Sequence, residues 1–211
     1  MPASGRPTVT LLLRHGQTPY SIDKRFAGRI DIGLTELGAS QAAAAAERLA
    51  KQGASDPIDA IVSSPLSRAR QTAAAVAALT QAPVTVENAF EEADFGEWDG
   101  LTFAQAQERF PEAMDAWLAS TEAAPPGGES FAAVRSRVLD GLSRVLAAHA
   151  GQTVLVVSHV TPMKVCVAEA LGAPLSAVYR MHLDTACLCQ IDWYPDGPAV
   201  VRSLNDIAHL R

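Results

Sequence analysis

Short apolar runs alternate along the chain with longer stretches whose apolar residues recur at helical spacing. Residues 9–13, 58–63 and 153–158 are rich in apolar residues, as is typical of strands that are buried on both faces. Residues 131–145 instead carry Phe, Val and Leu at intervals of three and four, which predicts a helix with one buried stripe. A chain that alternates strand and helix signals in this way predicts an α/β fold with a mostly parallel sheet.

Cap residues predict where the first two helices begin. Thr35 precedes an alanine-rich run, which we expect to form a helix that ends near Gly53. Ser64 and Pro65 predict a second helix, with Ser64 as its N-cap and Pro65 as its first residue. This start places Arg68 in the first turn of that helix.

A long helix is predicted to begin after Ser130, which has the side chain of a good N-cap. Arg135, Arg137 and Arg144 fall outside its apolar stripe, so we expect them on the outer, solvated face. Before this helix, Pro111 is expected to break another helical stretch in two.

The expected architecture is a three-layer α/β/α sandwich, in which a mostly parallel central sheet carries an antiparallel edge strand. Residues 186–193 and 199–204 predict an antiparallel hairpin at the sheet edge, joined by a Pro-Asp-Gly-Pro turn. Residues 19–33 lack a sustained helical period and predict a loop over the site. We expect residues 1–7 to be a disordered head or a linker stub, and residues 8–211 to form a single domain.

The composition is that of a globular domain, with 48% hydrophobic and 19% charged residues in a chain of 211. Its 17 basic and 23 acidic residues give a net charge of −6. Nucleic-acid-binding surfaces carry clustered Lys and Arg, so this balance argues against nucleic acid as a partner of this domain. A small basic pocket remains compatible with it.

The three cysteines, Cys166, Cys187 and Cys189, show neither the spacing of a zinc site nor that of a disulfide framework. We therefore expect reduced core thiols in a cytoplasmic protein. No apolar run approaches the ~20 residues of a membrane span, and no signal peptide is visible, so we expect no membrane partner.

Cationic and imidazole side chains follow three of the predicted strands. Arg14 and His15 come directly after the first strand, Arg68 lies just beyond the second, and His159 follows residues 153–158. The carboxyl ends of parallel strands meet at one edge of a sheet, where α/β proteins bind ligands. A guanidinium matches the geometry of phosphate oxygens, and an imidazole can act as a nucleophile. The sequence therefore predicts a pocket for a phosphate dianion, with no metal and no Walker-type loop.

Residues 90–100 contain five acidic residues among three aromatic ones. A plain solvated loop does not usually carry both Phe95 and Trp98. We expect these aromatic side chains to anchor the loop and to hold one carboxyl group in a partly dry place, where it can transfer protons.

These segments together resemble the histidine phosphatase superfamily, also called phosphoglycerate mutase-like. The resemblance extends from Leu11 to about Leu204. It is carried by the motifs Leu13-Arg14-His15-Gly16, Arg25-Phe26-Ala27-Gly28, Ser63-Ser64-Pro65-Leu66-Ser67-Arg68-Ala69, Glu92-Ala93-Asp94-Phe95-Gly96-Glu97-Trp98-Asp99-Gly100 and Val157-Ser158-His159.

Within the superfamily, the chain is most similar to the alpha-ribazole-phosphatase-like branch. The nearest resemblance is to the acid phosphatase domain that actinobacteria fuse behind a ribonuclease H domain. Residues 125–131 and 158–162 carry this closer similarity. It implies that residues 1–7 are a cut linker and that a ribonuclease H domain precedes this one in the native protein.

The resemblance implies a role for each residue at the strand ends. His15 would attack phosphorus and carry a phosphohistidine intermediate. Arg14, Arg68 and His159 would hold the phosphoryl oxygens and offset their charge in the transition state. No metal or other cofactor is required.

Glu92 would protonate the leaving group and then take a proton from the attacking water. It aligns with the acid of the family, and its neighbours Glu91 and Asp94 are the alternatives.

Gln17, Thr18 and Ser21 would line the phosphate or substrate mouth, with Val160 beside the second histidine. Ser21 stands where the family often has asparagine, which would weaken or reshape one phosphate contact. Val160 replaces a glycine that often follows the second histidine. Near relatives share this valine, so we expect it to be specific to the branch rather than inactivating.

The implied function is the metal-independent hydrolysis of a small phosphomonoester, with alpha-ribazole 5′-phosphate as the suggested substrate. One alternative is a phosphoglycerate mutase-type transfer between hydroxyls, and another is a non-catalytic phosphate-binding module. Residues 100–130 are shorter than the insert typical of the mutases, which favours hydrolysis. The sequence leaves the oligomeric state open, a homodimer included.

Overall fold

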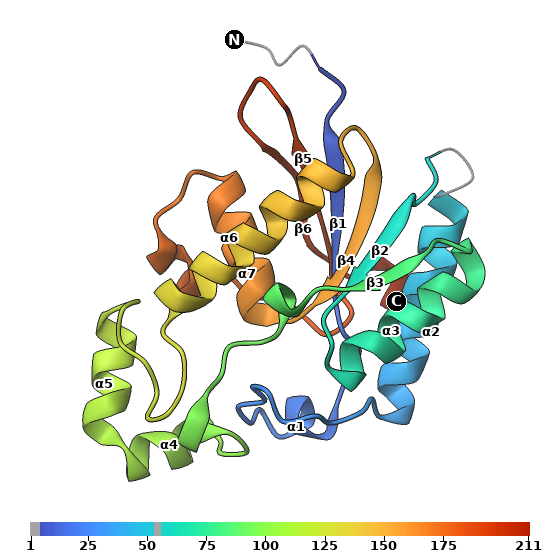
Figure 1. Ribbon diagram of the computed structural model, residues 1–211. Helices are drawn as coiled ribbons and strands as arrows, with labels where there is room; N and C mark the ends of the chain where they lie inside the picture. The colour runs from blue at the N-terminus through green and yellow to red at the C-terminus, as the bar shows by residue number, and fades with distance from the viewer. Residues whose placement is uncertain (1–4, 53–55) are drawn as a thin grey trace.

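The computed structural model describes residues 5–52 and 56–211. At its centre is a six-stranded mixed sheet (Figure 1). The strands are β1 (Thr8–Arg14), β2 (Ala60–Ser63), β3 (Val84–Val86), β4 (Thr153–Ser158), β5 (Leu188–Trp193) and β6 (Val200–Asp206).

The strands follow the order β3-β2-β4-β1-β5-β6 across the sheet. Strands β1 to β4 run parallel, whereas β5 is antiparallel to β1 and β6 is antiparallel to β5. The predicted hairpin at the sheet edge is therefore confirmed. Its antiparallel strand β5 lies one place inside the edge, because β6 pairs with its outer side.

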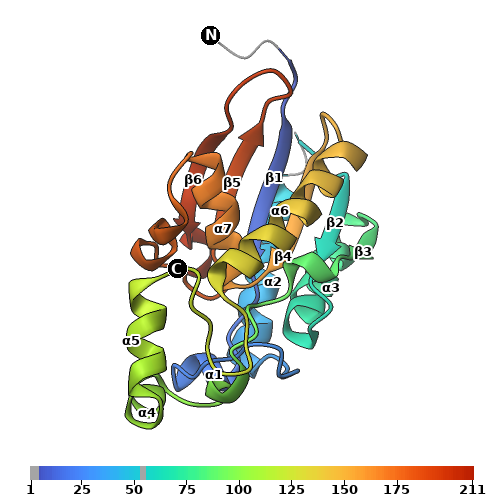
Figure 2. The same cartoon turned by 60° about the vertical axis from the view of Figure 1, so that its left-hand side comes forward.

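Helices cover both faces of the sheet (Figures 1 and 2). Helices α2 (Glu36–Gln52) and α3 (Ser67–Thr80) pack together on one face. Helices α6 (Phe131–Ala148) and α7 (Val160–Ala170) pack together on the other. The predicted three-layer α/β/α architecture is confirmed.

Strand β1 shows why its sequence is a continuous apolar run. Leu12 joins the core that α6 and α7 cover, whereas Leu11 and Leu13 join the core beneath α2 and α3. All three side chains are buried. Because successive residues of a strand point to opposite faces, a strand covered on both sides needs apolar residues at every position.

Two of the predicted helix starts are confirmed. The Thr35 hydroxyl accepts a hydrogen bond from the Gly38 amide at 3.0 Å, at the start of α2. Ser130 caps α6 by accepting from the Ala133 amide. The predicted end of α2 near Gly53 lies outside the described residues.

The predicted start of α3 is wrong. This helix begins at Ser67 with Leu66 as its N-cap residue, not at Pro65 with Ser64 as the cap. The amide and hydroxyl of Ser67 both donate to the Asp31 carboxylate at 2.7 Å, so a residue distant in sequence satisfies the helix start. Arg68 is still in the first turn.

The segment predicted as a loop over the site contains one helical turn, α1 (Pro19–Ile22), which a reciprocal Thr18–Ser21 capping box holds. Pro111 breaks a helical stretch as predicted, between α4 (Phe103–Arg109) and α5 (Pro111–Ala119). In Figure 1, α1, α4 and α5 lie below the sheet, beyond the carboxyl ends of its parallel strands. Short 3₁₀ turns complete the described elements: η1 (Asn88–Phe90), η2 (Gly96–Trp98), η3 (Leu175–Arg180) and η4 (Ala208–Leu210).

The expectation for the head falls mainly on residues 1–4, which lie outside the described part of the chain. Residues 5–7 lead into β1 without helix or strand. All three cysteines are buried and free, in agreement with core thiols.

Candidate active site

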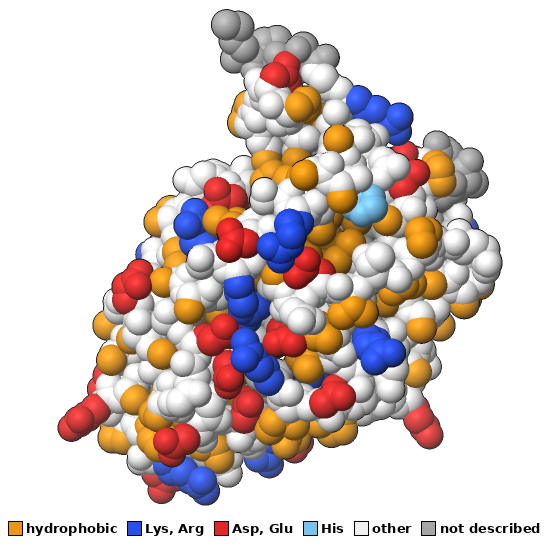
Figure 3. Space-filling view, in the orientation of Figure 1, with side chains coloured by type: hydrophobic (Ala, Val, Ile, Leu, Met, Phe, Trp, Pro, Cys, Tyr) orange, Lys and Arg blue, Asp and Glu red, His pale blue; other side chains and the backbone are white. Residues whose placement is uncertain are grey.

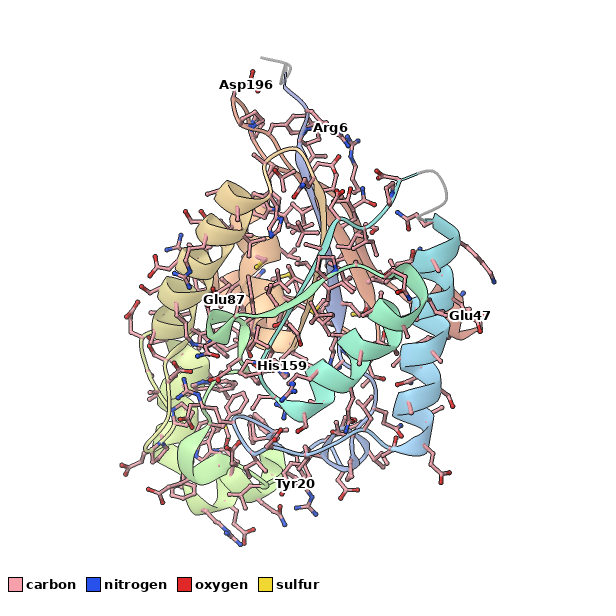
Figure 4. The ribbon with its side chains drawn as sticks, turned by 45° about the vertical axis from the view of Figure 1, so that its right-hand side comes forward. Arg6, Tyr20, Glu47, Glu87, His159 and Asp196 are labelled. Carbon is pink, nitrogen blue, oxygen red and sulfur yellow. The ribbon has the colours of Figure 1, made fainter. Side chains whose placement is uncertain are left out.

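Two histidines meet at the carboxyl ends of the adjacent strands β1 and β4. His15 follows β1 and His159 follows β4, and their ring centroids are 5.0 Å apart. The His15 amide donates to the Ser158 carbonyl at 3.1 Å, so the sheet ladder continues to the site. Figure 4 places His159 at the lower end of the sheet, above the segment that carries Tyr20. The structure thus brings together two residues that are far apart in sequence.

The His15 ring is held in one tautomer. Its Nδ1 lies 2.8 Å from the Gly16 carbonyl oxygen. Because a carbonyl can only accept, Nδ1 carries the proton and Nε2 keeps its lone pair. Burial lowers the pKa of His15 well below its ordinary value, and the charges of Arg14 and Arg68 lower it further. The ring is therefore neutral, as a nucleophile must be.

Gly16 fixes this corner through a close backbone approach. A Cβ atom at Gly16 would lie 2.2 Å from the Gly38 carbonyl oxygen, and one at Gly38 would lie 2.1 Å from the Gln17 carbonyl oxygen. Only glycine at both positions lets the turn after β1 rest on the first turn of α2.

Arg14 has donors that no described residue uses. Its Nη1 donates to the Leu183 carbonyl at 2.7 Å, but its Nε is buried without a partner among the described residues. The side chain lines the pocket that opens beside His15. An unpaired buried donor at a pocket wall fits an anionic ligand.

Arg68 is fully buried in the first turn of α3. Its Nε donates to His159 Nδ1 at 3.2 Å, and its Nη groups donate to the carbonyls of Ala27, Gly28 and Ile30. Four of its five N–H groups are thereby engaged within the protein. Burial is the main cause that lowers its pKa. In this structure Arg68 lies behind His159 and outside the pocket wall.

His159 uses both ring nitrogens. Because Nδ1 accepts from Arg68, Nε2 carries the proton and donates to the Ser64 hydroxyl at 2.7 Å. Burial, followed by the charge of Arg68, lowers the pKa of His159 well below its ordinary value. Ser64 is therefore a partner of the site rather than a helix cap. Its position directly after β2, the neighbour of β4, was the sequence signal for this contact.

Glu92 lies at the amino end of α7. Its carboxylate accepts from the Thr161 amide at 3.2 and 3.4 Å and from its own neighbour Ala93 at 2.8 Å. The first turn of a helix favours an anion through its free amides and dipole. The Glu92 side chain is buried and lines the pocket.

The two alternative acids face elsewhere. Glu91 pairs with Arg29 at 3.2 Å, and Asp94 lies 3.7 Å from the same guanidinium. Neither lines the pocket that contains His15 and Glu92.

Arg137 corrects the expectation that it would lie on a solvated outer face. Its Nη1 donates to the carbonyls of Ala89 and Glu91, and its Nη2 donates to the carbonyl of Glu92, all at 2.8–2.9 Å. Its remaining N–H groups form a fork to the Glu129 carboxylate. The segment around Glu92 crosses this side of α6 and covers Arg137, which the apolar period of the helix alone predicts to be exposed.

Glu129 extends this clamp to the other side of the loop, where its carboxylate accepts from the Asp94 amide at 3.0 Å. Figure 3 shows basic and acidic side chains alternating over this face of the molecule. No sequence period marks Arg137 or Glu129 as partners of the acid, because the contact joins three separate segments.

The aromatic anchors of the acidic loop are confirmed. Phe95 and Trp98 are both buried, and their rings lie 4.9 and 5.5 Å from that of Phe26. The loop is thus held by apolar packing on one side and by the clamp of Arg137 and Glu129 on the other.

The pocket has a volume of about 240 Å³. Its lining includes the polar residues Arg14, His15 and Glu92 and the aromatic residues Phe26, Phe95, Trp117 and Phe131. The other lining residues are Thr18, Ser21, Arg25, Ala27, Val160, Thr161 and Lys164.

The remaining residues that were predicted at the mouth of the site do not all line the same pocket. Thr18, Ser21 and Val160 line this pocket, whereas Gln17 lines an adjoining one. The Ser21 hydroxyl donates to the Thr18 carbonyl at 2.8 Å and so is committed to the turn. The Gln17 amide oxygen accepts from the Thr35 hydroxyl at 2.9 Å.

Within residues 5–52 and 56–211, no group of three or more His, Cys, Asp or Glu side chains is arranged to hold a metal ion. No helix in this described part is long and apolar enough to cross a membrane.

Two neutral histidines, two arginines and a buried carboxyl group thus meet at one edge of a mixed α/β sheet, and these groups match the geometry and charge of a phosphoryl group. Residues 10–206 match the model of the histidine phosphatase superfamily (branch 1), and the chain belongs to this superfamily.

Three relatives place it more closely. The chain is 48% identical over 208 residues to the bifunctional protein Rv2228c of Mycobacterium tuberculosis, which covers 99% of this chain and 56% of that protein. It is 33% identical over 201 residues to phosphoserine phosphatase 1 of Hydrogenobacter thermophilus, covering 95% of this chain and 93% of the relative. The crystal structure of a putative alpha-ribazole-5′-P phosphatase from Escherichia coli superposes with a TM-score of 0.84 at 29% identity, covering 95% and 97% of the two chains. The chain thus spans about half the length of its mycobacterial relative and nearly all of the other two.

Proposed function

We propose that the chain hydrolyses a small phosphomonoester through a phosphohistidine on His15, without a metal ion. One observation carries the proposal. His15 is neutral, its Nδ1 is bound to the Gly16 carbonyl, and its free Nε2 belongs to a pocket that also contains Arg14 and Glu92.

The reaction divides into two steps. In the first, His15 Nε2 forms a bond to phosphorus while the bond to the ester oxygen breaks, and protonated Glu92 gives its proton to the leaving alkoxide. In the second, Glu92 takes a proton from water as the water oxygen attacks phosphorus. Phosphate leaves, and the neutral histidine is restored.

The groups that hold the phosphoryl oxygens differ in whether their hydrogen-bond donors are already free. Arg14 offers donors that are already free. His159 can donate from Nε2 once a phosphoryl oxygen takes the place of the Ser64 hydroxyl. Arg68 keeps one unused N–H group and orients His159, so the arginine contributes positive charge and the neutral histidine contributes a hydrogen bond to the phosphoryl group. Thr18, Ser21 and Val160 line the mouth, with Gln17 beside it.

Alpha-ribazole 5′-phosphate is one candidate substrate, supported by the similarity to the Escherichia coli structure. Phosphoserine is another, supported by the similarity to the Hydrogenobacter enzyme over nearly the full length of both chains.

The native protein is proposed to be longer and bifunctional, with a ribonuclease H domain before this one. The 56% coverage of the bifunctional mycobacterial relative supports a second domain, and the sequence resemblance supports its kind. A cytoplasmic location is supported by the three buried free thiols.

The decisive experiment measures phosphate release from p-nitrophenyl phosphate, with and without a chelator and without bisphosphoglycerate. We expect stoichiometric phosphate, no effect of the chelator, and an enzyme quenched in alkaline denaturant whose peptide containing His15 carries one added phosphoryl group. Activity that returns only with added metal would refute the mechanism. Transfer between hydroxyls of phosphoglycerate without phosphate release would indicate a mutase, and phosphate binding without turnover would indicate a binding module.

A further inference from the structure

Two peptide planes meet at Gly16, and both bear on the ring of His15. The first plane contains the His15 carbonyl and the Gly16 amide. The second contains the Gln17 amide and the Gly16 carbonyl, which accepts from His15 Nδ1 at 2.8 Å. Glycine allows a wider range of φ and ψ than any other residue, so the two planes need contacts from elsewhere if the carbonyl is to keep facing the ring. Side chains of two helices supply such contacts.

Thr72 holds the first plane. It is fully buried on α3, one turn after Arg68. The Gly16 amide donates to the Thr72 hydroxyl at 3.2 Å, and this hydroxyl gives its own proton to the Arg68 carbonyl at 2.9 Å. At the other edge of the same plane, the His15 carbonyl accepts from the Ala186 amide at 3.1 Å. One hydroxyl thus joins the turn that carries His15 to the turn that carries Arg68.

Gln41 holds the second plane. It is a half-buried residue of α2, and its side-chain oxygen accepts from the Gln17 amide at 2.8 Å. In a trans peptide the N–H and C=O groups are coplanar and point in opposite directions, so a contact that orients the Gln17 amide also orients the Gly16 carbonyl. This is the carbonyl that binds the proton of His15 Nδ1. Gln41 therefore reaches the imidazole through a single peptide plane.

The sheet places His15 but does not select its tautomer. The His15 amide donates to the Ser158 carbonyl, and this contact fixes the backbone only. A neutral imidazole can carry its proton on either nitrogen, and the hydrogen bond made by one nitrogen decides which form is present. At His15 that hydrogen bond is made to the Gly16 carbonyl. The contacts of Thr72 and Gln41 consequently act on the ring, through Gly16, rather than on the position of the residue.

We propose that Thr72 and Gln41 are positioning residues for the nucleophile, which orient the Gly16 carbonyl and thereby keep the proton of His15 on Nδ1. The kinetic consequence rests on the phosphatase function proposed above, whereas the tautomer exists without any reaction. When the carbonyl is released, the proton moves to Nε2 in part of the molecules, and Nε2 then has no lone pair with which to attack phosphorus. The attack slows, whichever alcohol leaves.

The first test measures the tautomer directly, by long-range ¹H–¹⁵N NMR of protein labelled in its histidine rings. His15 is assigned as the signal that His15→Ala removes. Burial keeps the pKa of His15 well below its ordinary value, so at neutral pH the spectrum reports the tautomer of an uncharged ring. We expect the proton on Nδ1 in the unaltered protein and in Thr72→Ser, which keeps the hydroxyl. Thr72→Val and Gln41→Met are expected to populate the Nε2–H form, and the double variant is expected to populate it most.

The second test measures kcat/KM on p-nitrophenyl phosphate and on an alkyl phosphate, because this ratio reports the steps up to phosphorylation of His15. Thr72→Val is expected to lower it by about tenfold on both esters, the scale of one buried hydrogen bond. Gln41→Met is expected to have a smaller effect, because water can replace a half-exposed acceptor. Thr72→Ser is expected to restore most of the loss. Equal losses on the two esters separate these residues from those that act on Glu92.

The matched control is Thr80→Val on the same helix. The Thr80 hydroxyl also donates to the carbonyl four residues earlier, that of Val76 at 3.0 Å, and accepts an amide, that of Ala82 at 3.4 Å. Its loss is expected to change neither the tautomer of His15 nor kcat/KM. Thermal melting shows whether each variant folds, and Gln41→Met provides the test if Thr72→Val does not.

An unchanged tautomer in the folded variants, or kinetic losses that Thr80→Val reproduces and Thr72→Ser does not restore, would overturn the proposal. A proton on Nε2 in the unaltered protein would overturn it as well. If the variants shift the tautomer as expected while the unaltered protein hydrolyses no ester, the positioning of the ring is supported and the phosphatase function fails.

Discussion

The two sides of the active site are held by different kinds of contact. Backbone contacts hold the His15 corner. The His15 amide donates to the Ser158 carbonyl, the His15 carbonyl accepts from the Ala186 amide, and Gly16 packs against α2. The Glu92 segment belongs to no strand, and Arg137, 45 residues further along the chain, holds its carbonyl. His15, the proposed nucleophile, is therefore fixed by the sheet itself, whereas Glu92, the proposed acid, is held by side chains that converge on a loop.

This difference predicts different sensitivities. A substitution at the His15 corner changes the reacting group but leaves the sheet ladder in place. A substitution in the clamp of Arg137 and Glu129 leaves every proposed reacting group present but removes the contacts that hold the Glu92 segment. Four experiments test this contrast.

The largest effect is expected for His15→Ala. Without the imidazole no phosphohistidine forms, so kcat on p-nitrophenyl phosphate should fall by more than ~10⁴-fold, on the scale seen when a catalytic nucleophile is removed. The exposed His182→Ala variant is the control. Appreciable turnover by His15→Ala would show that the nucleophile is another group.

Glu92→Gln is expected to lower kcat by roughly 10²–10⁴-fold on an alkyl phosphate, the usual contribution of a general acid. The loss should be much smaller on p-nitrophenyl phosphate, because nitrophenolate leaves without a proton. Glu91→Gln and Asp94→Asn serve as matched controls, since both carboxylates lie at the Arg29 surface. A larger effect in either control would reassign the acid.

Arg137→Met is expected to lower kcat on an alkyl phosphate by about tenfold, because it removes three hydrogen bonds that position the loop of Glu92. The loss should shrink on p-nitrophenyl phosphate, and it should largely vanish in a background of Glu92→Gln. Arg135→Met is the control, since Arg135 lies on the same helix in an exposed pair with Glu169. A loss that is equal on both esters and additive with Glu92→Gln would show that Arg137 acts only on general stability.

The smallest expected effect is on the pH dependence of stability. The pKa values of His15 and His159 lie well below the ordinary 6.5 in the folded protein, mainly because of burial. Below pH 6.5 the unfolded chain binds protons that the folded rings do not, so the free energy of unfolding should fall as the pH drops from 6.5 to 5. Each ring contributes up to ~1.4 kcal/mol per pH unit. Urea unfolding measures this slope.

In the same experiment His15→Ala should flatten the slope, because one of the two buried rings is then absent. An unfolding free energy that is constant over this range would mean that the folded rings are protonated.

The helix α6 shows where reasoning from periodicity ends. The Phe131 to Val145 stripe and the Ser130 cap are local properties, and both were predicted correctly. Arg137 lies outside the stripe and was expected in solvent. It is covered because the Glu92 loop passes over that side of the helix, a fact that depends on segments elsewhere in the chain.

Ser64 and Ser67 give the same lesson at the start of α3. A Ser-Pro pair has the local pattern of a helix start, but Asp31 supplies the cap at Ser67 and leaves Ser64 free for His159. A remote carboxylate therefore satisfies the helix start at Ser67, and a remote imidazole binds the serine that the local sequence predicted as the cap.

Local sequence patterns were sufficient to predict the main strands, the order of strand and helix, and the position of Arg14, His15, Arg68 and His159 at the strand ends. Those features follow from hydrophobic period and from the rule that parallel strands share one carboxyl edge. Three-dimensional contacts were needed to establish which nitrogen of each ring carries the proton, which of three neighbouring carboxylates lines the pocket, and which residues hold that carboxylate. Those outcomes depend on burial and on contacts between residues far apart in the chain, which no local pattern records.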